Sequence, residues 1–235
     1  MLGNDVVDLR DPDTRPETFR PRFDERVFAP LERRAIERDA DPHARRWAHW
    51  AAKEAAYKLA KQVDAGFIFS PSKLVARFST AAEQTGDRVE RRGTLELPSA
   101  IGPMIQELEL RSFETTERVH VLAQPAGADW EAVVSAVEPL DQAEDPSAAV
   151  RRLVISRIAQ DLGVPADRIG IGRRGRIPTV EIDGSESTMA ISLSHHGGWV
   201  ACAMALRFDG TLPISRATTE DVLTDRKAIV RRAAL

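Results

Sequence analysis

The chain has 235 residues, of which 43% are hydrophobic and 29% charged. These fractions are ordinary for a globular protein, and the length suits one large domain or two small ones. The formal net charge of -3 gives no global basicity that would indicate nucleic acid or a membrane surface as a partner. No segment resembles a signal peptide, and no apolar run approaches the roughly 20 residues of a membrane span. We therefore expect a cytoplasmic protein.

The single cysteine, Cys202, excludes a disulfide framework within the chain. Its neighbours in VACAMAL are small or apolar. This setting is typical of a buried core residue rather than a nucleophile.

Residues 2–9, LGNDVVDL, have the composition of a short buried strand. Asp5 lies in its middle, where an unpaired carboxylate is costly to bury. A metal ion is one possible partner for that carboxylate. The alternative is that Asn4 and Asp5 form a turn just before the strand.

Residues 10–46 are rich in charge of both signs, and every cation among them is arginine. Arginine suits bidentate contacts to carboxylates and phosphates. RFDERVF predicts a helical turn, Pro30 a break, and the residues after it a second helix. Asp41 and Pro42 then have the residue types expected for the N-cap and first position of a longer helix.

That longer helix contains RWAHWAAKEAAYKLAKQ, residues 46–62. At helical period, Trp47 and Trp50 share one side with Glu54, Lys58 and Lys61. An acid and bases beside two large aromatic residues are unusual on a plain surface helix. The spacing alone nevertheless favours an exposed Glu-to-Lys pair four residues apart, worth a few tenths of a kcal/mol, over a functional face.

Alternating apolar and polar residues predict three or four antiparallel strands between residues 67 and 125, with a turn at 85–87. A linker is predicted at 125–127. The second half repeats the order strand, helix, strands, with the helix at 147–164, and a further helix is predicted at 220–232. We expect one half over residues 1–125 and another over 126–235.

The stretch ISLSHHGGWVACA carries Ser192 and Ser194 in alternation with apolar residues, followed by His195, His196 and two glycines. Small residues after the histidines leave room for a ligand close to the backbone. The alternative is a pair of histidines that ends a strand and binds nothing. A zinc site is disfavoured, because no cysteine lies near and the chain has only three other histidines.

Together, GNDVVDL, RFDERVF leading into WAAKEAAYK, and SLSHHGGWVACA resemble the signature elements of the 4'-phosphopantetheinyl transferases. The resemblance implies an enzyme that uses magnesium to transfer the phosphopantetheine group of coenzyme A to a serine of an acyl or peptidyl carrier protein. Adenosine 3',5'-bisphosphate is the other product. Fatty acid, polyketide and peptide carriers are all compatible with it.

The order of the motifs is that of the small trimeric holo-acyl-carrier-protein synthases, whereas the length is that of the monomeric type. The resemblance therefore implies an α+β fold with two similar α/β halves, which form a pseudodimer with the active site in the cleft between them. Relative to the monomeric type, the halves would be exchanged in sequence. Because both halves lie in one chain, we expect a monomer.

The resemblance also implies residue roles. Asp5 and Glu54 match the magnesium ligands, and two carboxylates are a usual protein contribution to a six-coordinate Mg²⁺. Lys58 matches the lysine that contacts the pyrophosphate. Ser194 and His195 match the pair that contacts a phosphate of coenzyme A, the 3'-phosphate in our interpretation.

Further positions match less closely. Arg176, in RRGRIP, is carried over as a contact to the nucleotide, with Arg174 beside it. Arg151 or Arg152 can replace an arginine of the monomeric type that has no direct match. Lys53 is assigned to coenzyme A binding, with structural support as its alternative role.

The general base stays open among Glu54, neutral Lys58 and a metal-bound water. Candidates for docking the acidic carrier are the arginines after the first strand, which are Arg10, Arg15, Arg20, Arg22 and Arg26. Pairing of these arginines with nearby acids is the alternative. Two other functions fit the same residues: a catalytically weak module that binds coenzyme A or the carrier, and a magnesium-dependent phosphoesterase.

Overall fold

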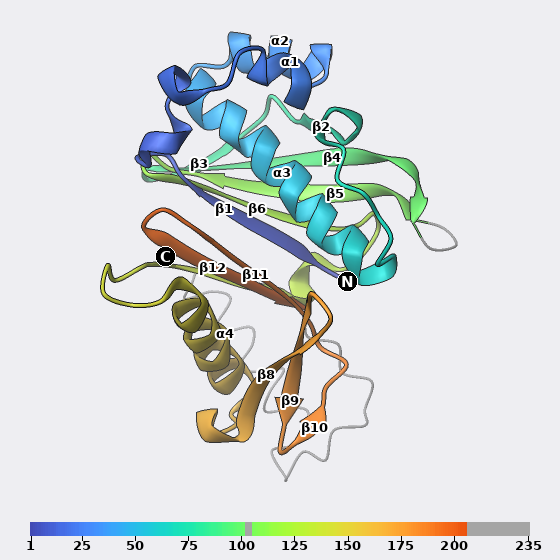
Figure 1. Ribbon diagram of the computed structural model, residues 1–235, viewed down its shortest axis with the longest axis vertical. Helices are drawn as coiled ribbons and strands as arrows, with labels where there is room; N and C mark the ends of the chain where they lie inside the picture. Colours follow the sequence, from blue (N-terminus) through green and yellow to red (C-terminus); the bar gives the residue numbers. More distant parts are fainter. Residues whose placement is uncertain (102–104, 206–235) are drawn as a thin grey trace.

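The computed structural model describes residues 1–101 and 105–205 (Figure 1). The tail from Arg207, with the helix predicted at 220–232, lies outside the described residues. Among those described, no helix is long and apolar enough to cross a membrane.

The first part of the chain contains one strand, three helices and five further strands. Their bounds are β1 Gly3–Asp8, α1 Phe23–Val27, α2 Pro30–Arg38, α3 Pro42–Val63, β2 Val75–Phe78, β3 Glu83–Thr85, β4 Arg88–Ile101, β5 Ile105–Glu114 and β6 Arg118–Pro125. The predicted strand, helical turn, second helix and long helix are all confirmed. The Asp41 carboxylate caps α3 by accepting from the backbone N–H groups of His43 and Ala44, as the sequence predicts.

The second part begins with a strand, continues with one helix and ends in strands. Their bounds are β7 Val133–Pro139, α4 Pro146–Leu162, β8 Ile169–Arg174, β9 Ile177–Ile182, β10 Ser185–Glu186, β11 Ala190–His196 and β12 Trp199–Ala205. Gly163 ends α4 in the left-handed conformation, which glycine adopts without steric cost. The order strand, helix, strands is confirmed.

The described strands form three antiparallel sheets. The largest has the order β1-β6-β5-β4-β2, with β3 paired to β4, and the others have the orders β11-β12-β7 and β10-β9-β8. The two parts of the chain share a pattern of strand pairing. In the first part β1 pairs with β6 and β6 with β5, and in the second part β7 pairs with β12 and β12 with β11. In each, the first strand also precedes the longest helix of that part.

Each main helix packs on its own sheet, and Figure 1 shows α1 and α2 beyond α3, away from the sheet. The buried face of α3 is dominated by alanine, which lets the helix approach the strands closely. The α4 helix packs against the smaller sheets through a second apolar core, which includes Cys202. Burial raises the pKa of the Cys202 thiol to about 12, which accords with its predicted core role.

A third apolar cluster joins the two parts of the chain. Its fully buried members are Leu2 and Ala203, and Leu122 and Ala205 lie beside them. These residues come from β1, β6 and β12 and the ends of those strands. The contact places β1 between α3 and the strands of the second part.

Gly3 permits the closest contact between β1 and α3. A Cβ atom at Gly3 would lie only 1.9 Å from the carbonyl oxygen of Ala55, a distance that real Cβ contacts do not reach. Any side chain there would force the strand away from the helix. The glycine of the GNDVVDL motif therefore sets the position of the whole strand.

We expect Gly3→Ala to lower the free energy of unfolding by about 2–3 kcal/mol, because overpacking at a backbone contact cannot be relieved by a rotamer change. Urea denaturation checks this value. The matched control is Gly170→Ala in β8, where the added Cβ would make only ordinary contacts at 3.6 Å to Glu181. Equal stabilities of the two variants would contradict the account of Gly3.

Candidate active site

The site is built where β11 lies beside β1. One edge of β1 pairs with β6. On its other edge, the outer edge, backbone N–H groups donate to side chains of β11 and not to the backbone of a neighbouring strand. These bonds join Asn4 to Ser192 Oγ at 3.0 Å, Val6 to Ser194 Oγ at 3.2 Å and Asp8 to His196 Nδ1 at 3.2 Å. Alternate residues of both strands take part, as the two-residue period of a strand requires.

Asp5 is the centre of the polar cluster. It is 8% exposed, and its Oδ1 accepts from Lys58 Nζ at 2.8 Å and from Ser194 Oγ at 2.7 Å. The Lys58 ammonium also donates to the carbonyl oxygen of Asn4 at 3.0 Å. These donors offset the cost of burying the carboxylate. Asp5 thus lies within the strand with partners, and the alternative turn is wrong.

Glu54 lies one helical turn before Lys58 on α3. Burial and the nearby charge of Asp5 raise the pKa of Glu54 to about 7, and Lys58 offsets part of that rise. The carboxylates of Asp5 and Glu54 are therefore balanced by the single ammonium group of Lys58. When both carboxylates are ionised, these three side chains have a net charge of -1.

The donor set of Asp5 and Glu54 fits a hard divalent cation such as Mg²⁺. Both ligands are carboxylates, and after burial the charge of Asp5 is the next cause of the raised pKa of Glu54. No cluster of three or more histidine, cysteine, aspartate or glutamate side chains suited to a metal occurs in the described part of the chain. The protein would supply two ligands here, so the remaining ones would come from water or substrate.

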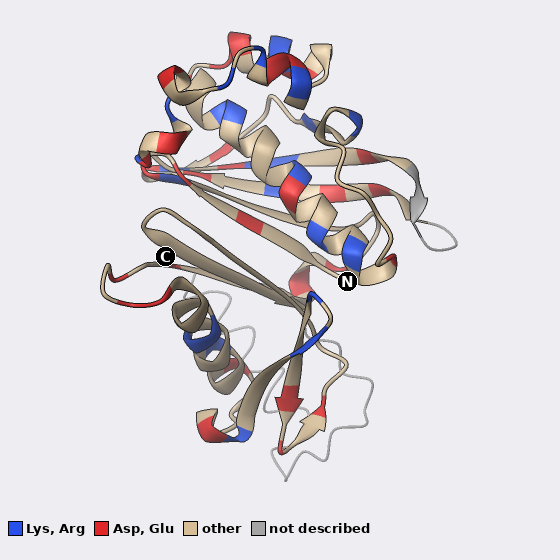
Figure 2. Cartoon of the chain, viewed as in Figure 1, with Lys and Arg blue, Asp and Glu red and all other residues tan. Residues whose placement is uncertain are grey.

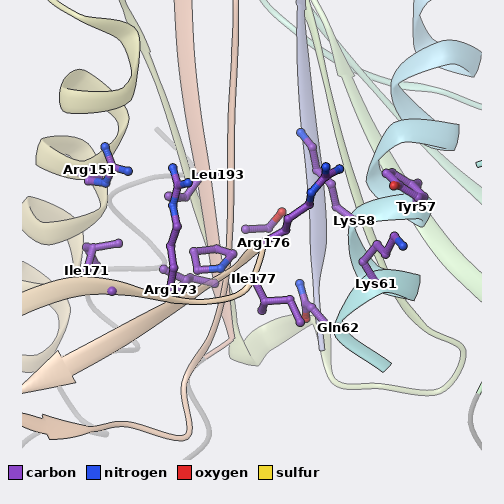
Figure 3. Close-up of a pocket in the computed structure, with 14 residues that line it drawn as sticks. Tyr57, Lys58, Lys61, Gln62, Arg151, Ile171, Arg173, Arg176, Ile177 and Leu193 are labelled. Atoms are coloured by element: carbon purple, nitrogen blue, oxygen red, sulfur yellow. The ribbon is translucent and has the colours of Figure 1, made fainter. Parts of the chain in front are cut away.

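A pocket of about 440 Å³ opens beside this cluster, between α3 and the second part of the chain (Figure 3). Of the residues that the structure describes, several cations and no acids line it. The lining cations are Lys58, Lys61, Arg151, Arg173 and Arg176. Figure 2 shows the basic positions at the end of α3 and on the turn between β8 and β9 that faces it. This combination attracts a ligand with several negative charges.

The sequence offered two pairs of arginines as ligand contacts, and in each pair the structure shows one member lining the pocket and the other forming ion pairs elsewhere. Arg176 lines the pocket, whereas Arg174 pairs with Glu186. Of the other pair, Arg151 lines the pocket, while Arg152 forms surface ion pairs with two glutamates of its own half.

The two residues predicted to contact phosphate lie differently from each other. Ser194 is 5% exposed and its hydroxyl group faces β1. His195 is exposed and is not among the residues that line the pocket. Ser194 is therefore joined to the carboxylate cluster, whereas the predicted phosphate contact of His195 stays a prediction.

Lys53 does not occupy a position where it can contact coenzyme A. Its side chain is fully buried, and Nζ donates to the two carboxylate oxygens of Glu32 at 2.8 and 2.7 Å and to the carbonyl oxygen of Leu74. His49 lies 3.4 Å from the same carboxylate. The predicted ligand contact is corrected to structural support, because this ion pair holds α2 on α3.

Sequence reasoning missed two participants, Ser192 and Arg173. Ser192 precedes Ser194 by two residues, so strand alternation places both on one face. Arg173 carried no distinguishing signal, because three arginines lie within RRGR and only the fold shows which ones reach the pocket. Lys61 was predicted to share the face of Glu54 and was given no role, but it lines the pocket.

Residues 1–88 match the 4'-phosphopantetheinyl transferase superfamily. The matching family model, ACPS, includes β1 and the whole of α3, and hence Asp5, Glu54 and Lys58. The resemblance seen in the sequence is confirmed over that range. Among solved structures, one similar chain is the holo-[acyl-carrier-protein] synthase of Thermotoga maritima, with 15% identity and a TM-score of 0.32 over 79% of this chain and 83% of that one. No curated protein matches the chain.

The raised pKa of Glu54 makes stability depend on pH. The ordinary pKa of a glutamate side chain is 4.5, and that of Glu54 in the folded chain is about 7, so the folded state binds the proton more tightly. Stability from this group is present below pH 4.5 and is lost as pH rises to about 7. Glu54→Gln removes that loss, so without divalent cations its melting temperature should exceed that of the native protein by a few degrees at pH 8 and by less at pH 5.

Thermal unfolding at the two pH values, in the presence of a chelator, measures this difference. Glu96→Gln is the matched control, because Glu96 is exposed and pairs only at the surface with Arg77. If the melting temperatures of Glu54→Gln and the native protein differed by the same amount at both pH values, the raised pKa of Glu54 would be contradicted.

Proposed function

We propose that this protein transfers the 4'-phosphopantetheine group of coenzyme A to a serine of an acyl or peptidyl carrier protein. The observation that carries the proposal is the double role of Lys58, which binds Asp5 and also forms a wall of the cationic pocket. A cation held by Asp5 and Glu54 would therefore lie beside phosphates bound in the pocket. Matched residues 1–88 contain all three side chains.

Two similar halves, residues 1–125 and 126–235, make the pseudodimer that we propose. The corresponding strand orders β1-β6-β5 and β7-β12-β11 support it, and so does a pocket lined by both halves. The half with Asp5 precedes the half with Ser194, which is the exchange in order that the sequence predicts. A monomer would then contain a complete site.

In this site, the cationic side chains would hold the phosphates of coenzyme A, with Lys58 on the pyrophosphate. Magnesium, when bound by Asp5 and Glu54, would neutralise negative charge on the pyrophosphate. The carrier serine oxygen would form a bond to the phosphorus that carries pantetheine. The bond from that phosphorus to adenosine 3',5'-bisphosphate would break.

Neither Glu54 nor Lys58 suits the role of general base while the cation is bound, so water is the remaining acceptor of the serine proton. Glu54 would be a ligand of the cation, which would displace the proton behind its pKa of about 7. Lys58 already donates to Asp5 and to a backbone carbonyl.

The carrier would dock at the arginines that follow β1. Arg10 and Arg22 already form surface ion pairs, with Glu117 and Glu25 respectively. No ion pair within the described residues occupies the other three candidates, Arg15, Arg20 and Arg26. Exposed cations without an ionic partner are available to an acidic carrier surface, and their contribution would weaken with salt.

Incubation with coenzyme A, Mg²⁺ and an apo carrier protein should give a carrier with one phosphopantetheine adduct, detected by intact mass. Asp5→Asn and Glu54→Ala should each lower the rate at least 100-fold, because each removes a proposed ligand of the cation that would neutralise charge at the reacting phosphates. If the protein binds coenzyme A but no tested carrier acquires the adduct, the result would favour a module that only binds coenzyme A or the carrier. Hydrolysis of coenzyme A without a carrier would favour a phosphoesterase.

Two adjacent arginines test the pocket itself. Arg151→Ala should raise KM for coenzyme A about 10- to 100-fold, the effect of losing one charge-assisted contact. Arg152→Ala should leave KM within about threefold of the native value, because its surface pairs with Glu138 and Glu144 contribute little. Steady-state kinetics with one carrier supplies both values. A larger effect at Arg152 would place the ligand elsewhere.

A further inference from the structure

A second pocket, of about 680 Å³, lies entirely within the first half of the chain. It is bounded by α2, by the first turn of α3, by the end of β2 and by β4. Arg45, in its wall, precedes Lys58 by 13 positions on α3, a separation of roughly 20 Å along the helix axis. The second pocket is therefore distinct from the proposed active site.

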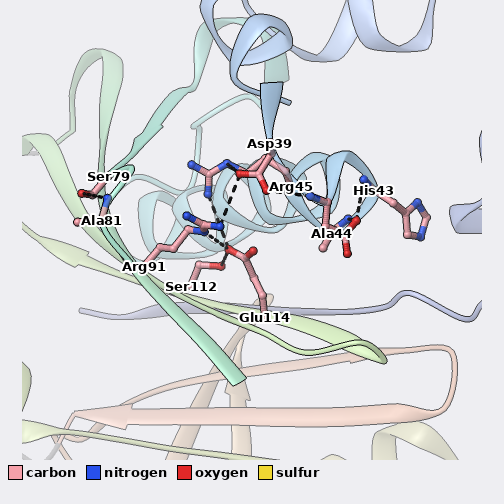
Figure 4. A network of polar contacts seen from close by, with 10 residues as sticks. Asp39, His43, Ala44, Arg45, Ser79, Ala81, Arg91, Ser112 and Glu114 are labelled. Carbon is pink, nitrogen blue, oxygen red and sulfur yellow. Dashed lines mark hydrogen bonds and ion pairs between the residues drawn. The ribbon is translucent and has the colours of Figure 1, made fainter. Parts of the chain in front are cut away.

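The floor of this pocket contains two arginines that are incompletely satisfied. Figure 4 shows Arg45 and Arg91 between the carboxylates of Asp39 and Glu114. The closest approaches are 3.6 and 3.8 Å for Arg45 and 3.6 Å for each contact of Arg91. These are ion-pair separations, longer than good N–H···O hydrogen bonds.

Three guanidinium nitrogens consequently make no hydrogen bond within the described residues, although each lies 3.6–3.8 Å from a carboxylate oxygen. They are Nε and Nη1 of Arg45 and Nε of Arg91, all buried and without a hydrogen-bond partner in the described part of the chain. Arg45 is only 4% exposed. Buried polar groups are almost always hydrogen-bonded, so the long contacts of these two arginines leave donor capacity for a ligand with several acceptor oxygens.

The charge around the pocket has the sign and size that a phosphate requires. Arg34 and Arg38 lie exposed on α2 at the rim, one helical turn apart, and no ion pair within the described residues occupies either. Four guanidinium groups face two carboxylates, those of Asp39 and Glu114, which leaves a formal charge of +2. Arginine also has the planar donor geometry that matches phosphate oxygens.

The rest of the lining is small or apolar. Leu31, Ala35, Ala40 and Phe78 contribute to it, together with Thr80. The volume exceeds the space needed for phosphate alone. The ligand should therefore carry an organic part that packs against these side chains.

We propose that this pocket binds a small phosphate monoester, whose dianionic phosphate contacts the four arginines and whose apolar portion lies against α2 and Phe78. The site is independent of the transfer reaction. A concave pocket with buried donors at its floor suits a small molecule better than a protein surface.

Phenyl phosphate is a suitable probe, with inorganic phosphate for comparison. Calorimetry should show saturable binding of both, tighter for phenyl phosphate. The double variant Arg34→Ala, Arg38→Ala should weaken the binding of phenyl phosphate at least tenfold, because it removes the two rim charges and leaves the buried floor intact. The control Arg92→Ala removes an exposed arginine of β4 that does not line the pocket, and should change nothing.

A second readout locates the ligand. In ¹H–¹⁵N spectra, the Nε–H signals of Arg45 and Arg91 should move on addition of phenyl phosphate to the native protein and stay in place in the double variant. Equal, weak binding in all variants would mean an adventitious ion only and would overturn the proposal. So would unchanged phosphate binding accompanied by loss of carrier-protein binding in the double variant, which would make this face a protein-docking surface.

Discussion

The structure depends on the outer edge of β1. One edge of this strand pairs with the backbone of β6, and the other donates three N–H groups to side chains of β11. A buried edge with unpaired N–H groups would be costly. Because the acceptors are side chains, the two strands are held in one register while β11 keeps its own backbone pairing with β12. The same bonds join the two parts of the chain and bring Ser194 to Asp5.

Three lysines on α3 show how one helix serves three environments. Lys53 points to α2 and is neutralised by Glu32 in the core. Lys58 points to β1 and neutralises Asp5, while Lys61, near the C-terminal end, lines the pocket. Removing one partner from a buried pair such as Lys53 and Glu32 commonly costs about 3–5 kcal/mol. The helix is thus fixed on one side by an ion pair and is left free on the other side to present charge to a ligand.

Much of this was accessible from sequence because it is local. The Asp41 cap and the helical turn from Glu54 to Lys58 follow from residue types and period alone, whereas a turn at Asp5 stayed open as the alternative to the strand. The burial of Lys53 could not be predicted, since it depends on Glu32, which lies 21 residues earlier, reaching the same interior. The orientation of Ser194 could not be predicted either, because its partner Asp5 lies 189 residues away in the chain. Sequence spacing selects the residues of a site, whereas long-range packing decides which of them face the ligand.

The charge balance of the carboxylate cluster links its stability to its proposed chemistry. Lys58 satisfies Asp5, whereas burial and then the charge of Asp5 raise the pKa of Glu54 to about 7. A divalent cation that bound both carboxylates would displace that proton, and its affinity would therefore rise with pH through neutrality. It would also compete with Lys58 for Asp5, which would release the ammonium toward the cationic pocket. Two carboxylates with one ammonium between them would thereby suit the binding of a cation and a phosphate together.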